Sequence, residues 1–117
     1  MRDHKKLRAF ELADELVLLV YKATRDFPKE EQFGLTSQLR RATVSTASNL
    51  VEGCARNSEA DYLHFLDMAY SSARDTEYQI SLASRLGYLS EKACQELEIK
   101  CEETSKVIGG LIRSLRK

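Results

Sequence analysis

The sequence has few of the residues that interrupt a helix. One proline and five glycines are spread over 117 residues, and tryptophan is absent. Because proline and glycine disfavour helix interiors, their scarcity favours long helices over a sheet with many turns. With 43% hydrophobic residues, a chain of this length can build one core. We therefore expect a single all-α domain spanning residues 1–117.

The chain also lacks an excess of charge of either sign. Eighteen Lys and Arg residues balance eighteen Asp and Glu residues. A neutral chain has no overall attraction to nucleic acid or to anionic membranes, so any such contact must be local. No apolar run approaches the roughly 18 residues of a membrane-spanning helix, and the N-terminal segment has no apolar core of a signal peptide. We expect a cytoplasmic protein with no membrane contact.

Patterns typical of metal or catalytic sites are missing too. The three cysteines, Cys54, Cys94 and Cys101, form no CxxC pair, and the histidines His4 and His64 lie far apart. Zinc sites need Cys or His ligands at short spacing, and a nucleophilic cysteine needs a base beside it. The odd cysteine count indicates reduced thiols. We predict no metal, no cofactor and no enzymatic activity.

Four segments carry apolar residues three or four positions apart, the spacing of an amphipathic helix. These segments cover approximately residues 7–26, 36–54, 59–86 and 91–117. Pro28 follows the first, Thr36 is a candidate N-cap of the second, and Ser58 and Ser90 are candidate N-caps of the third and fourth. Gly87 suits the left-handed position after the third helix. Short connections favour antiparallel neighbours, which predicts an up-down-up-down four-helix bundle.

The second segment has a polar stripe beside its apolar one. The residues of this polar stripe, with one glutamate from the third segment, are Gln38, Arg41, Ser45, Asn49, Glu52 and Glu77. Buried polar groups need partners, so we interpret the stripe as a structural set of ion pairs and hydrogen bonds, inside the bundle or between subunits. Two alternatives stay open: an acid/base site containing Glu52 and Glu77, and a surface that faces a partner.

One end of the predicted bundle should be basic, because both termini and the second connection meet there. With Arg40 from the second segment, the candidate surface for nucleic acid or a partner comprises Lys5, Lys6, Arg8, Arg40, Arg56, Arg113, Arg116 and Lys117. The C-terminal cations complement the dipole of the last helix and need no ligand for that. The N-terminal cations gain no such benefit, which favours a phosphate-contacting surface.

A glycine pair, Gly109 and Gly110, interrupts the otherwise helical last segment. Each glycine costs about 1 kcal/mol relative to alanine inside a helix. Close approach of another helix is the natural compensation. We therefore expect helix packing at this pair, within the chain or against a neighbouring subunit.

The run FPKEEQFGLTSQLRRA at residues 27–42, with Asn49 and Glu52-Gly53 after it, closely resembles the four-helix-bundle family encoded in bacterial 23S rRNA intervening sequences. The pattern continues to the LGYL turn at residues 86–89. The resemblance implies a short bundle that assembles into a homopentameric ring, with a genetic link to ribosomal RNA. A related branch, the accessory proteins of diversity-generating retroelements, implies a basic pentameric partner of a reverse transcriptase, but this chain differs from it in having no net charge.

Together, the residues and the resemblance predict a non-enzymatic, homo-oligomeric scaffold or adaptor. We expect a pentamer that presents a charged surface to RNA or to a nucleic-acid-processing protein. The alternative is a module that contacts protein alone, without nucleic acid. Salt-dependent retention on structured RNA would separate the two hypotheses.

Overall fold

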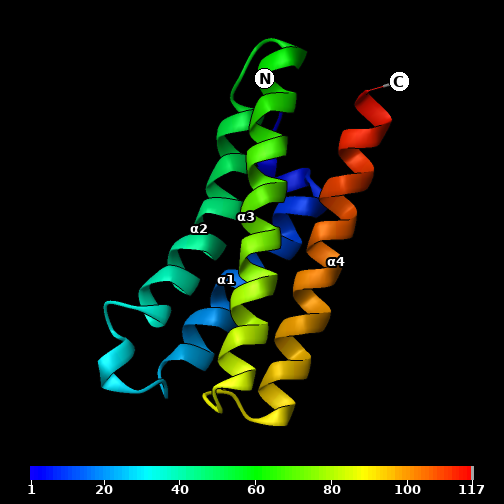
Figure 1. The fold of residues 1–117 in the computed structure, drawn as a ribbon. Coiled ribbons are helices and arrows are strands. Elements are labelled where there is room, and N and C mark those ends of the chain that lie inside the picture. Colours follow the sequence, from blue (N-terminus) through cyan, green and yellow to red (C-terminus); the bar gives the residue numbers. More distant parts are fainter. Residues whose placement is uncertain (117) are drawn as a thin grey trace.

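The computed structural model describes residues 1–116 and shows four antiparallel α-helices (Figure 1). The helices are α1 (Arg8–Thr24), α2 (Leu35–Cys54), α3 (Glu59–Arg85) and α4 (Glu91–Leu115), with the short 3-10 helices η1 (His4–Lys6) and η2 (Lys29–Glu31) before α1 and α2. Helices α1 and α3 each pack against α2 and α4, and the α2–α3 contact is the most extensive. The prediction of an all-α four-helix bundle is confirmed.

The core consists of two clusters stacked along the bundle. The cluster nearer the chain termini is rich in alanine, with Ala9, Ala13, Ala69 and Ala73 all buried. Alanine lets helix backbones approach closely, and larger side chains of the same cluster fill the remaining space. The second cluster occupies the other half and is built from longer side chains of all four helices and of the α1–η2 connection: Leu16, Val20, Phe27, Leu35, Leu39, Ile80, Leu97 and Cys101. The apolar stripes of the sequence therefore meet along the bundle axis.

Three of the predicted helix ends form as expected. The Ser58 hydroxyl accepts the backbone N–H of Asp61 at 3.1 Å, and the Ser90 hydroxyl accepts that of Ala93 at 3.1 Å. Gly87 has a φ of +81°, the left-handed conformation that favours glycine. These side-chain caps satisfy N–H groups that the first turn of a helix leaves without partners.

The N-cap predicted for α2 is wrong. The helix begins at Leu35, so Thr36 lies inside it, and Gly34 occupies the capping position. The backbone N–H of Leu35 donates instead to a carboxylate oxygen of Glu31 at 3.0 Å. A side chain from η2 thus replaces the expected hydroxyl, because the chain turns back tightly enough to bring that carboxylate to the helix start.

None of the helices in the described part of the chain is long and apolar enough to cross a membrane.

Candidate functional site

The chain termini and the α2–α3 connection lie at one end of the bundle (Figure 1), which we call the terminal end. The N-terminal segment is fixed there by Arg2, whose backbone N–H donates to the carbonyl of Cys54 at 2.7 Å. The guanidinium of Arg2 lies 3.8 Å from the ring centre of Tyr62. These two contacts place η1 beside the end of α2.

Some cations at the terminal end are neutralised by carboxylates. Arg8 pairs with Glu11 at 2.7 Å and with Glu103 at 3.3 Å. Arg116 forms a two-pronged contact with Asp67, and this carboxylate raises the pKa of the guanidinium. Charges used in such pairs are less available to a phosphate, so these two arginines connect α1 and α3 to α4 rather than form a free cationic surface.

Other cations at this end form a long ion pair or none among the described residues. Within residues 1–116, Lys5, Lys6 and Arg113 form no ion pair. The side chains of Lys5 and Lys6 are exposed on η1. Arg56 forms only a long pair with Glu52, at 3.9 Å, and its guanidinium lies 4.7 Å from the ring centre of Phe65.

Two members of the predicted basic surface do not belong to this group. Arg40 lies near the other end of the bundle, where its Nε donates to the hydroxyl of Thr24 at 2.8 Å and its guanidinium stacks on Tyr21. Arg40 is therefore separate from the cations at the terminal end, because about four helical turns lie between it and Arg56. Lys117 lies outside the described residues.

The polar stripe forms a short ladder between α2 and α3. The hydroxyls of Ser45 and Ser72 lie 2.9 Å apart, and the amide of Asn49 donates to Ser45 at 3.1 Å. All three side chains are half-buried. This part of the stripe therefore holds the two most extensively packed helices together, whereas Gln38 and Arg41 are both exposed.

The two glutamates of the stripe are not brought together. Glu52 pairs with Arg56 and lines a hollow beside α1. Glu77 pairs with Arg74 at 2.8 Å and lines a groove between α3 and α4. A pair of carboxylates that share an acid/base task must face one substrate, and these two face different surfaces. Within the described chain, no group of three His, Cys, Asp or Glu residues is placed to hold a metal ion.

The three cysteines are buried free thiols. Burial raises the pKa of the Cys101 thiol to about 12, and its Sγ donates to the carbonyl of Ala73 at 3.5 Å. Burial also raises the pKa of the Cys54 and Cys94 thiols. A thiol that is protonated and covered is a poor nucleophile, so these cysteines are core residues.

The glycine pair on α4 behaves differently at its two positions. A Cβ atom at Gly109 would lie 3.3 Å from the ring of Tyr70 on α3 and 3.3 Å from the Arg113 guanidinium. At Gly110 the nearest atom, a guanidinium nitrogen of Arg113, would be 3.7 Å away. Gly109 thus allows a close contact with α3 inside the chain, and the guanidinium of Arg113 lies over both glycines.

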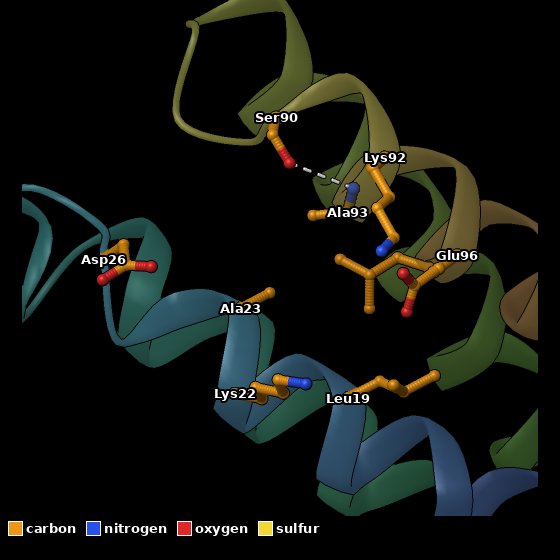
Figure 2. Close-up of a pocket in the computed structure, with 9 residues that line it drawn as sticks. Leu19, Lys22, Ala23, Asp26, Ser90, Lys92, Ala93 and Glu96 are labelled. Carbon is orange, nitrogen blue, oxygen red and sulfur yellow. Dashed lines mark hydrogen bonds between the residues drawn. The ribbon is translucent and has the colours of Figure 1, made fainter.

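A further feature was missed by the sequence reasoning. At the end opposite the termini, a groove of about 270 Å³ lies between α1 and α4 (Figure 2). We call it the α1–α4 groove. Its lining is apolar from Leu19, Ala23, Ala93 and Leu97, with charged side chains around it. The sequence signal for it is the small size of Ala23 and Ala93, which are half-buried on α1 and α4.

Comparisons with known proteins give a family and a fold. The family model described as 23S rRNA-intervening sequence protein matches residues 5–110. The crystal structure of a protein with unknown function from the S23 ribosomal protein family of Bacteroides thetaiotaomicron is similar, with a TM-score of 0.81 and 22% identity, over 90% of this chain and 95% of that chain. At this identity the likeness shows the shared fold alone. No curated protein matches the chain.

Proposed function

The chain belongs to the 23S rRNA-intervening sequence protein family, and from this premise we propose that it is a homo-oligomeric scaffold that binds structured RNA at its terminal end. Five subunits is the number that the family resemblance implies. The observation that carries the RNA contact is a group of cations at that end, Lys5, Lys6 and Arg113, that form no ion pair among residues 1–116. The family description and the similar structure indicate no reaction, and the scaffold needs none.

Phosphate contacts explain how a chain without net charge can bind RNA. Binding depends on the cations that reach the phosphates, since each contact releases counterions from the nucleic acid. In a ring, the same three cations recur in every subunit, and linked sites raise the effective concentration for the next contact. No aromatic residue interleaves with these lysines, so the proposed contact is to the backbone rather than to bases.

The test is a salt titration of RNA binding. A hairpin RNA is retained by the wild-type protein at low ionic strength, and the logarithm of its affinity falls linearly with the logarithm of salt concentration. The double substitution Lys5→Glu, Lys6→Glu weakens binding and makes the slope shallower by about 1 for each phosphate that the protein no longer neutralises. The matched control is Arg25→Glu, Arg85→Glu, which changes the same charge at the opposite end of the bundle.

No retention of RNA at low ionic strength would refute the proposal. An equal loss of binding in a control variant that keeps the wild-type native mass would also contradict it, because the effect would then follow net charge rather than position. The second candidate function is a module that contacts protein alone. The observation that favours it is the set of exposed apolar side chains away from the terminal end, with Phe33, Ile99 and Leu18 the most exposed among them.

A further inference from the structure

Phe33 is an aromatic side chain displayed to solvent by a well-fixed loop. It is 91% exposed and lies between η2 and α2. Glu31, two residues earlier, accepts the N–H of Leu35 at 3.0 Å and the hydroxyl of Tyr88 at 2.9 Å. The loop is therefore tied to the start of α2 and to the α3–α4 turn. A large apolar side chain on a fixed loop is typical of an interface anchor.

The α1–α4 groove has the size and the lining to receive such a ring. Its volume is about 270 Å³, and a cavity of roughly 150 Å³ is enough to bind benzene. The small side chains of Ala23 and Ala93 leave the hollow open, and Leu19 and Leu97 supply apolar contact (Figure 2). Nothing within the described chain fills it.

The loop and the groove lie at the same end of the bundle but on different sides of it. In Figure 1 the loop before α2 projects at the lower left, while α4 begins on the other side of α3. Helices α2 and α4 are diagonal neighbours, because each contacts α1 and α3. A loop on one side and a groove on another can join identical copies head to tail.

The charges around the two surfaces are compatible. Phe33 follows the exposed Glu30 and the nearby Lys29, and the groove is bordered by side chains of both signs. Those at the border are Lys22, Asp26, Lys92 and Glu96. Both surfaces thus carry charges of both signs, which favours a second copy of this chain over a partner of uniform charge.

We propose that Phe33 of one copy inserts into the α1–α4 groove of the next copy. This contact rests on the proposed function, because it supplies the link between subunits of the homo-oligomer. It is heterologous, so repetition produces a closed ring when the rotation closes. The terminal end, with Lys5 and Lys6, remains uncovered by it.

The first test is the native mass of the Phe33→Ser variant. Because Phe33 is exposed, its removal leaves the fold of the monomer intact, which circular dichroism checks. Losing an interface anchor weakens association at least roughly thirtyfold, so the variant dissociates at concentrations where the wild type is assembled. The matched control, Ile99→Ser, removes another exposed apolar residue, 68% exposed, from outside the groove and keeps the wild-type mass. A monomeric wild type, or an assembled Phe33→Ser variant, overturns the proposal.

The second test identifies the two surfaces directly. The native cysteines are buried, so introduced thiols are selectively joined by a short bis-maleimide linker. Mixing the single variants Gln32→Cys, beside the retained Phe33, and Lys92→Cys, on the groove lining, gives cross-linked dimers, and the double variant gives a ladder of larger species. Cross-linking of Gln32→Cys alone would indicate a symmetric contact between two loops and would overturn the proposal, as would absence of any mixed product from an assembled protein.

The tests separate this contact from RNA binding. An assembled protein that cross-links as expected but retains no RNA supports the contact and refutes the proposed RNA function. A Phe33→Ser monomer that still binds RNA, with lower affinity than the assembled wild type, supports both. RNA binding by a wild type that is monomeric at all concentrations supports the terminal surface and refutes the contact.

Discussion

Helices α2 and α3 approach each other closely at Gly53, and replacing this glycine by alanine should destabilise the protein. A Cβ atom there would lie 3.0 Å from the Cβ of Phe65 and 3.3 Å from a ring carbon of Tyr62. The Cβ of Phe65 is fixed to its own backbone and cannot rotate away, so the helices must separate. Overpacking of this kind costs about 1–3 kcal/mol, and the better helix propensity of alanine returns about 0.5–1 kcal/mol. We expect a net destabilisation of about 1–2 kcal/mol.

Thermal unfolding followed by circular dichroism measures this destabilisation. The unfolding entropy is about 2.1 cal/mol/K per residue, so in a chain of 117 residues the melting temperature should fall by about 4–8 °C. The control is Gly110→Ala, where the nearest atom is 3.7 Å away on a flexible arginine. This variant should melt higher, because alanine gains up to about 1 kcal/mol in a helix. Equal protein concentrations are needed, since association shifts the transition. A Gly53→Ala protein that melts at or above the wild-type temperature would refute the packing argument.

Three further predictions follow from buried or paired polar groups. Thr43→Val should stabilise the protein by about 1–2 kcal/mol, because the Thr43 hydroxyl is buried without a partner among the described residues. Thr46→Val should destabilise it by about 1 kcal/mol, because the Thr46 hydroxyl donates to the carbonyl of Ala42. Urea unfolding measures both changes in the free energy of unfolding. Burial raises the pKa of the Cys101 thiol from its usual 9.0 to about 12. Between these pH values the unfolded chain loses the thiol proton and the folded chain keeps it, so the free energy of unfolding falls as the pH rises. Unfolding measured at alkaline pH should therefore show a steeper loss of stability for the wild type than for Cys101→Ala. The backbone N–H at the start of α2 and the Tyr88 hydroxyl lower the pKa of Glu31. The free energy of unfolding of the wild type should therefore fall as the pH is lowered and the Glu31 carboxylate is protonated. Acid unfolding of Glu31→Gln should show a smaller dependence on pH.

The sequence predicted those parts of the fold that depend on neighbouring residues. Ser58 and Ser90 cap helices through N–H groups three residues away, and Gly87 needs only its own backbone conformation. The start of α2 was predicted wrongly because its capping group, the carboxylate of Glu31, reaches it through the loop geometry. No spacing rule in the sequence separates this case from capping by Thr36.

The candidate site was less predictable for the same reason. The charge of Arg116 is used by Asp67, which is distant in the sequence and close only in the folded bundle. Lys5 carries the same formal charge, but its side chain forms no ion pair among residues 1–116. Both residues are cations in the sequence, but only the folded structure shows which of them is paired with a carboxylate.

The neutral composition of the chain is therefore compatible with an RNA-binding scaffold, because the relevant quantity is the free charge at one end. Carboxylates neutralise Arg8 and Arg116, leaving Lys5 and Lys6 exposed on η1. If Phe33 joins subunits at the opposite end, assembly covers none of these lysines and repeats them around the ring. Increasing the subunit number then raises the density of phosphate contacts without raising the net charge of any subunit. Self-association and RNA binding should consequently be separable by mutation at opposite ends of the bundle.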